Sequence, residues 1–130
     1  MRTLDTNVVV RLLVGDDPHQ TPIAEHAFLE AITAGGVYLP DVVLAEVGWV
    51  LRGYGLDRES RFRLLERLVR TRGVVVDNID AVIDALERFR DGSNLADQLI
   101  LARARRLHAL PVLTFDARFA SSEGVERLKG

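Results

Sequence analysis

Short β-branched runs alternate with longer segments of helical period along this chain, and this alternation constrains its fold more than any other feature. The strand-like runs lie at residues 2–5, 37–39, 74–76 and 112–114, with a weaker one at 125–127. The helical segments cover residues 18–34, 41–52, 58–71, 79–90 and 95–108. Helical connections of this length fit right-handed crossovers between parallel strands. The sequence therefore predicts an α/β fold, a three-layer α/β/α sandwich with a mostly parallel central sheet.

Length and composition predict one domain over residues 1–130. The chain has 130 residues, of which 48% are hydrophobic, and this is enough to bury a core without disulfides. It contains no cysteine, which excludes cysteine proteases, redox motifs and zinc held by thiolates. The apolar run at residues 8–14 is too short to span a bilayer and lacks a signal-peptide pattern, so we expect a cytoplasmic protein with no membrane association.

The basic residues are almost all arginine, with Lys129 as the only lysine. A lysine buried in an active site is therefore not available, which argues against Schiff-base chemistry and phosphate clamping by an ammonium group. A net charge of −2 excludes a polycation that coats nucleic acid, so local patches matter more. Two arginine patches are either solvated helix faces or contacts to RNA phosphates: Arg63, Arg67 and Arg70, and Arg103 and Arg106.

Four carboxylates lie where a parallel α/β sheet usually binds ligands. Asp5 follows the first strand and Asp116 follows the fourth, so both should project from the same sheet edge. Glu46, five residues into its helix, sits beside the apolar stripe and should point inward or nearly so. Asp97 interrupts the apolar face of the helix that begins near residue 95.

Carboxylates that converge in this way indicate a divalent metal. A buried carboxylate without a partner costs several kcal/mol, on the order of the penalty for an uncompensated buried ion. Hard oxygen ligands without a cysteine or histidine cluster select Mg²⁺ or Mn²⁺ over zinc. Cleavage of a phosphodiester by a metal-activated water is the reaction that such a site favours.

Each acid also has a purely structural interpretation. Asp5 and Asp116 are placed to cap the helices that follow them. Asp97 lies three residues after Asn94, where a carboxylate completes a capping box or favours the helix dipole. Glu46 is within reach of a pairing arginine, so capping and pairing remain alternatives to catalysis.

The four acids in their local contexts resemble the PIN-domain nucleases. The matching segments are Asp5-Thr6-Asn7, Leu44-Ala45-Glu46-Val47, Leu95-Ala96-Asp97-Gln98-Leu99-Ile100 and Leu113-Thr114-Phe115-Asp116. Within that family the chain looks most like the VapC-type toxin ribonucleases of bacterial and archaeal toxin–antitoxin pairs, and the match covers nearly the whole chain. The resemblance implies a PIN-like fold and an endoribonuclease that cleaves RNA with Mg²⁺ or Mn²⁺. It also implies a homodimer inhibited by a small antitoxin protein.

The resemblance also assigns roles to individual residues. It makes Asp5, Asp97 and Asp116 metal ligands, and Glu46 a ligand or a base that orients water. Two neighbouring polar residues, Asn7 and Thr114, would hold those carboxylates in place. Asn94 stands where relatives often carry a further acid, and it can cap the helix or hold a metal-bound water.

Three other functions compete with a toxin ribonuclease. The chain could be a PIN nuclease outside a toxin–antitoxin system, or a PIN scaffold that binds RNA without cutting it. A phosphatase of the haloacid dehalogenase type also places an aspartate after its first strand. That chemistry needs a second aspartate two positions later and a buried lysine, whereas this chain has Asn7 and a lysine only in its tail.

Overall fold

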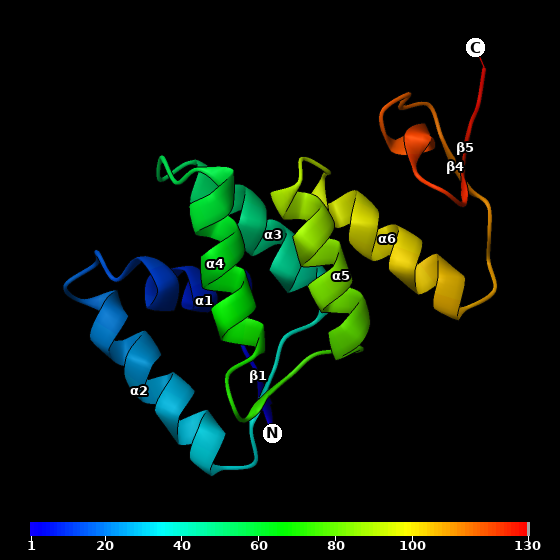
Figure 1. Cartoon of the computed structure of the whole chain (residues 1–130). Helices are drawn as coiled ribbons and strands as arrows, with labels where there is room; N and C mark the ends of the chain where they lie inside the picture. Colours follow the sequence, from blue (N-terminus) through cyan, green and yellow to red (C-terminus); the bar gives the residue numbers. More distant parts are fainter. Residues whose placement is uncertain (130) are drawn as a thin grey trace.

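The computed structural model describes residues 1–129, and the α/β fold class is confirmed (Figure 1). The helices in this part of the chain are α1 (Thr6–Val14), α2 (Gln20–Thr33), α3 (Asp41–Arg52), α4 (Arg58–Val69), α5 (Ile79–Arg90), α6 (Leu95–Arg106) and the short 3₁₀ helix η1 (Phe119–Ser121). The strands are β1 (Arg2–Thr3), β2 (Val37–Tyr38), β3 (Val74–Val75), β4 (Val112–Thr114) and β5 (Val125–Arg127). The predicted helices agree with these bounds to within two residues at each end.

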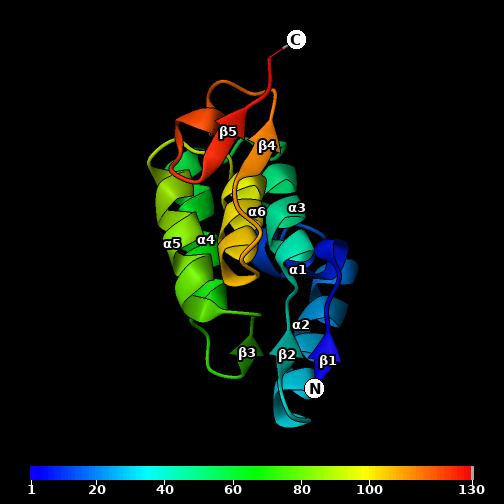
Figure 2. The ribbon, with the colours of Figure 1, turned by 90° about the vertical axis from the view of Figure 1, so that its right-hand side faces the viewer.

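The strands form two separate parallel sheets instead of one central sheet. One sheet has the order β1-β2-β3, and the other contains only β4 and β5. Arg2 is in register with Val37, and Val112 is in register with Val125. Figure 2 shows β4 and β5 at the opposite end of the molecule from β1–β3. The parallel pairing was predicted correctly, but the first and fourth strands lie in different sheets, so Asp5 and Asp116 do not project from one sheet edge as expected.

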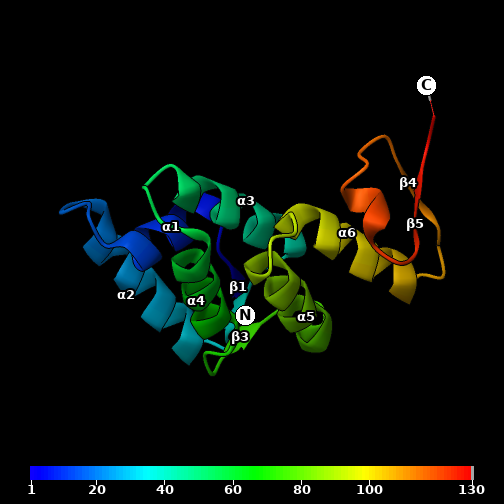
Figure 3. The same ribbon diagram turned by 45° about the horizontal axis from the view of Figure 1, so that its top comes forward.

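Figure 3 shows the arrangement of the helices, and the main core lies between them. Its fully buried residues include Val9 of α1, Val47 and Leu51 of α3, and Leu65 of α4. Each such side chain stabilises the fold by roughly 1.5–3 kcal/mol through removal from water. The last residue of this core along the described chain is Leu99 in α6. The main body therefore consists of residues 1–106, and Val37 of β2 is also fully buried in its core.

Side chains and glycine set the helix boundaries. Asp5 accepts a hydrogen bond from the backbone N–H of Val8 at 3.2 Å and caps α1, which ends at Gly15 with φ 67°. Asn94 caps α6 in the same way. Pro40 holds the cap position of α3, and Asp41 is the first helical residue, where its charge favours the dipole.

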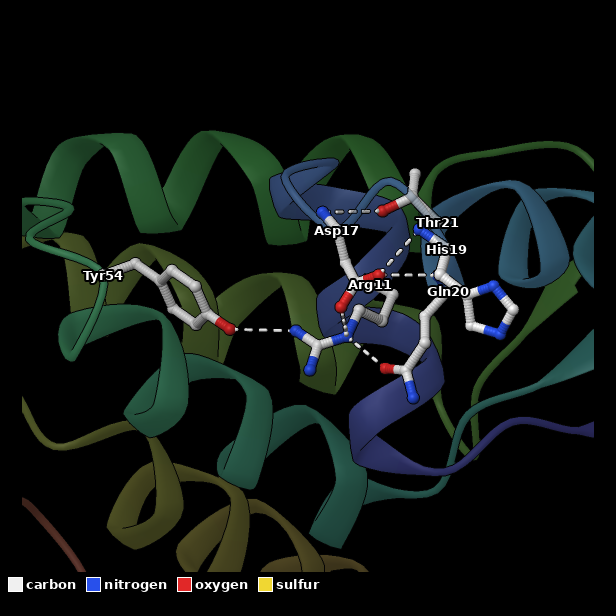
Figure 4. Close-up of polar contacts among 6 residues, drawn as sticks. All are labelled: Arg11, Asp17, His19, Gln20, Thr21 and Tyr54. Atoms are coloured by element: carbon white, nitrogen blue, oxygen red, sulfur yellow. Dashed lines mark hydrogen bonds and ion pairs between the residues drawn. The ribbon is translucent and has the colours of Figure 1, made fainter.

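Arg11 joins α1 to the start of α2 and to the loop after α3 (Figure 4). Its Nη1 donates to the Tyr54 hydroxyl at 3.0 Å, and its Nε donates to Gln20 at 2.7 Å. Asp17 lies 4.0 Å from the same Nε. The backbone N–H groups of Gln20 and His19 donate to Asp17 and lower the pKa of its carboxyl. His19 occupies the cap position of α2 but makes no capping hydrogen bond with its side chain. Asp17 caps the helix instead.

An ionic network ties α6 to the ends of β2 and β3. The Arg103 guanidinium contacts the carboxylates of Asp77 and Asp41, the latter at 3.5 Å. The Tyr38 hydroxyl donates to Asp77 at 2.5 Å, and this contact raises the pKa of the tyrosine. Arg103, predicted as a contact to RNA, is therefore engaged within the protein. Among residues 1–129, no helix is long and apolar enough to cross a membrane.

Candidate active site

Asp97 and Asp116 line one polar pocket of about 410 Å³ at the start of α6. Asp97 is half-buried, whereas Asp116 is exposed. Burial raises the pKa of Asp97, and the negative charge of Asp116 raises it further. The two carboxylates that sequence reasoning placed on different elements therefore share one electrostatic environment.

Local hydrogen bonds fix both acids. The side chain of Asn94 accepts the backbone N–H of Asp97 at 3.0 Å, which places Asp97 in the first turn of α6. Asp116 is held by the turn after β4, where the Thr114 hydroxyl accepts its backbone N–H at 3.0 Å. One Asp116 oxygen accepts the backbone N–H groups of Arg118 and Phe119 at 2.7 and 3.2 Å. Asn94 is thus confirmed as the cap of α6. Asp116 instead closes the turn before η1, whose cap position is Arg118, and Thr114 supports the backbone of Asp116.

Glu46 lines the adjoining pocket of about 650 Å³. Its side chain is exposed, so the prediction that it points inward is wrong. The buried face of α3 is formed by Val43, Val47 and Leu51, and Glu46 lies at its solvent margin. In the described part of the chain Glu46 forms no ion pair with an arginine. It therefore stays available for a ligand.

Asp5 does not join these acids. It caps α1, is exposed, and lines a different pocket together with Asn7, Arg11 and His19. Within residues 1–129 no group of three or more acidic or histidine side chains lies close enough to hold a metal ion. The cause is the separation of the two sheets, because Asp5 follows β1 whereas Asp116 follows β4.

Two arginines that sequence reasoning did not assign to the site, Arg58 and Arg118, line both pockets. The Arg58 Nη1 donates to the carbonyl oxygens of Phe89 and Ser93 at 2.7 and 2.8 Å, and its guanidinium lies 4.8 Å from the centroid of the Phe89 ring. These contacts fix the segment that leads into α6. The sequence contained one indication that Arg118 belongs to the site, because it lies only two residues after Asp116.

The predicted arginine patch on α4 faces away from the main core. Arg63, Arg67 and Arg70 are exposed, and two of them pair with acids one turn away. The Arg63–Glu59 distance is 3.1 Å, and the Arg70–Glu66 distance is 3.6 Å. Arg106, in the second patch, is half-buried on α6. None of these side chains lines the pockets of Glu46, Asp97 and Asp116.

The Asp97–Asp116 pocket offers the type of oxygen ligand that Mg²⁺ and Mn²⁺ prefer. Both side chains offer hard carboxylate oxygens, and Mg²⁺ is usually held by one or two carboxylates while it keeps several waters. The raised pKa of Asp97 indicates that its ionised form lacks compensating positive charge. A divalent cation would supply that charge.

The chain belongs to the PIN-domain family, because the family model for the PIN domain matches residues 3–124. This match includes all four acids of the sequence analysis. PIN domains are generally nucleases, and the nucleases among them generally use divalent metals. No curated protein and no solved structure matches the chain.

Proposed function

We propose that this protein is a metal-dependent endoribonuclease that hydrolyses RNA phosphodiester bonds. The observation that carries the proposal is the pair Asp97 and Asp116 in one polar pocket, with the pKa of Asp97 raised by burial and by its neighbour. Two carboxylates in such a pocket repel each other, and a divalent cation relieves this repulsion.

The residues of the site would have different roles in the reaction. Asp97 and Asp116 would hold Mg²⁺ or Mn²⁺, and Glu46 in the adjoining pocket would complete the ligands or orient the attacking water. When bound, the cation lowers the pKa of water and neutralises charge on the phosphate. Arg58 and Arg118 stand at both pockets, where guanidinium groups suit phosphate oxygens.

An exposed tryptophan supports a single-stranded nucleic acid as the substrate. Trp49 lines the Glu46 pocket and is 67% exposed, and the Arg52 guanidinium lies 5.6 Å from its ring centroid. Bases stack on such aromatic side chains without regard to sequence, and arginine contributes further attraction. RNA is the nucleic acid that the resemblance to VapC-type enzymes implies.

That resemblance also supports a toxin role. We propose that the protein acts in the cytoplasm as the toxin of a toxin–antitoxin pair, as a homodimer that a small antitoxin inhibits. A PIN nuclease outside such a system and a non-catalytic RNA-binding scaffold are the alternatives. The phosphatase alternative is disfavoured by Asn7 and by the single lysine in the tail.

The test of catalysis compares Asp97→Asn and Asp116→Asn with Glu87→Gln, an exposed acid on α5 that lies outside both pockets. Cleavage of a fluorescent single-stranded RNA is measured with Mg²⁺, with Mn²⁺ and with chelator. We expect the two aspartate variants to lose on the order of 100-fold or more in rate, and the control to match the wild type. Near-normal cleavage by either aspartate variant, or cleavage that persists in chelator, would contradict the proposal.

The toxin role has a separate test. Induced expression of the wild-type chain should arrest bacterial growth, and expression of Asp97→Asn at the same level should not. RNA cleavage in vitro without growth arrest would favour a nuclease outside a toxin–antitoxin system. RNA binding without cleavage would favour the scaffold.

A further inference from the structure

Among residues 1–129, Arg61 of α4 is the one charged residue that is buried, with 8% of its surface exposed. Its Nη1 donates to the Gly48 carbonyl oxygen at 3.1 Å, and its Nε donates to the Asp57 carbonyl oxygen at 3.4 Å. Within the same residues it forms no ion pair with a carboxylate. A charge that leaves water without a counter-ion destabilises a fold, so such groups concentrate at functional sites. The missing counter-ion therefore indicates an anionic ligand.

Two further arginines increase the positive charge around Arg61. Burial lowers the pKa of Arg61, and the positive charges of Arg58 and Arg52 lower it further. Arg58 and Arg61 also lie against one aromatic ring, because their guanidinium carbons are 4.8 and 5.2 Å from the centroid of Phe89. A cation–π contact attracts a guanidinium group but does not neutralise its charge. Phe89 therefore holds two like charges close together without an ion-pair partner.

These three arginines line the pocket of about 650 Å³ that Glu46 and Trp49 also line, which we call the Arg61 pocket. Arg118 adds a fourth guanidinium group, and Glu46 is the only carboxylate among the described residues of the lining. In the described part of the chain none of the four arginines pairs with an acid. Sites for small ligands usually measure about 300–1,000 Å³. The Arg61 pocket thus offers room for one nucleotide and an excess of positive charge.

The charge of this pocket fits a phosphate at the end of an RNA strand better than a phosphate inside the strand. An internal phosphodiester carries a single negative charge, whereas a terminal phosphate carries about 1.5–2 negative charges at pH 7 and presents three acceptor oxygens. Arginine donates pairs of hydrogen bonds to such oxygens. Proteins that follow a nucleic-acid backbone use a charged groove along the strand. Arg61 is instead buried, so it meets a group that enters the pocket.

We propose that the Arg61 pocket binds the terminal phosphate of a single-stranded RNA, with the phosphate at Arg61 and the terminal base on Trp49. The inference rests on the proposed function, because Arg58 and Arg118 also line the adjoining pocket of the two aspartates. The strand end is thus held beside the site of cleavage. Hydrolysis of a phosphodiester leaves a phosphate on one of the two new ends. The preferred substrates are therefore RNA strands that another nuclease has already cut.

Binding in chelator tests the pocket without reference to cleavage. Three RNAs share one short sequence with an internal fluorescent label, and they carry a 5′-phosphate, a 3′-phosphate, or hydroxyl groups at both ends. Fluorescence anisotropy measures the affinity for each. We expect at least one phosphorylated RNA to bind about tenfold or more tightly than the RNA with hydroxyl ends, because its phosphate adds charge-assisted hydrogen bonds. The RNA that gains affinity identifies the end that the pocket holds. Equal affinity for all three would overturn the proposal.

Substitution of single arginines tests whether this pocket is the source of the preference. Arg61→Gln removes the buried guanidinium group, and Arg52→Gln removes an exposed one that has little influence on folding. Each should reduce the affinity gained from the phosphate by about threefold or more. Arg88→Gln is the matched control, because Arg88 is exposed on α5, pairs with Asp84 and lies outside both pockets. An unchanged gain in Arg52→Gln and in folded Arg61→Gln would overturn the proposal.

The outcomes separate this inference from the proposed function. RNA cleavage by a protein that gains no affinity from a terminal phosphate would overturn the inference and leave the nuclease in place. A gain that depends on Arg61 and Arg52, in a protein that does not cleave RNA, would support the pocket and overturn the nuclease.

Discussion

Replacement of Arg58 by alanine should loosen the segment that positions α6. Arg58 donates hydrogen bonds of 2.7 and 2.8 Å to two backbone carbonyls and stacks on Phe89. A hydrogen bond from a charged donor contributes roughly 1.5–3 kcal/mol when protected from water, and a partly exposed one contributes less. The stacking adds about 0.5–1 kcal/mol. Because Arg58 is half-buried, we expect the free energy of unfolding to fall by about 2–4 kcal/mol.

Urea unfolding followed by circular dichroism measures this loss. Arg63→Ala on the same helix is the matched control, because Arg63 is exposed and makes one ion pair with Glu59 that should contribute under about 0.5 kcal/mol. Hydrogen exchange should also become faster at the first amides of α6 in Arg58→Ala and stay unchanged in the control. Equal destabilisation by the two substitutions would refute the argument that Arg58 fixes this segment.

Three further predictions concern Asp97, His108 and Trp49. In chelator, Asp97→Asn should melt at a higher temperature than the wild type at neutral pH, because the folded state disfavours the ionised carboxylate. The difference should shrink as the pH falls through the raised pKa of Asp97 and vanish below its usual value of 3.8; a constant difference would be inconsistent with this cause. His108→Gly should stabilise the fold by about 0.5–1 kcal/mol, because His108 has a φ of 54° after α6, and an unchanged urea midpoint would count against strain there. Trp49→Ala should weaken binding of single-stranded RNA by about 1–3 kcal/mol, and an unchanged affinity in a fluorescence titration would exclude base stacking on this ring.

The helices could be predicted from the sequence because their signals are local. Asn94 lies three residues before Asp97, and this spacing alone predicted the cap that the structure shows. The apolar spacing of Val43 and Val47 likewise predicted α3 over its observed range. Such patterns involve neighbouring residues, so tertiary contacts changed them little.

The arrangement of the strands could not be predicted in the same way. Strands of two or three residues carry no signal for which neighbour they pair with, so the separation of β4 from β1 became visible only in the structure. The exposure of Glu46 also depends on what covers α3, which periodicity does not specify. On α6 the buried face includes Gln98, which bonds Ser122, whereas Ile100 is exposed. Contacts from residues after α6, such as Ser122, determine which side chains of α6 are buried.

The order in which the core residues occur along the chain has a consequence for synthesis. A ribosome releases the N-terminal part of a protein first, and domains can fold before synthesis is complete. Because the main core ends at Leu99, its apolar residues are all present before β4 and β5 emerge. β4 and β5 thus meet a body that can already have folded.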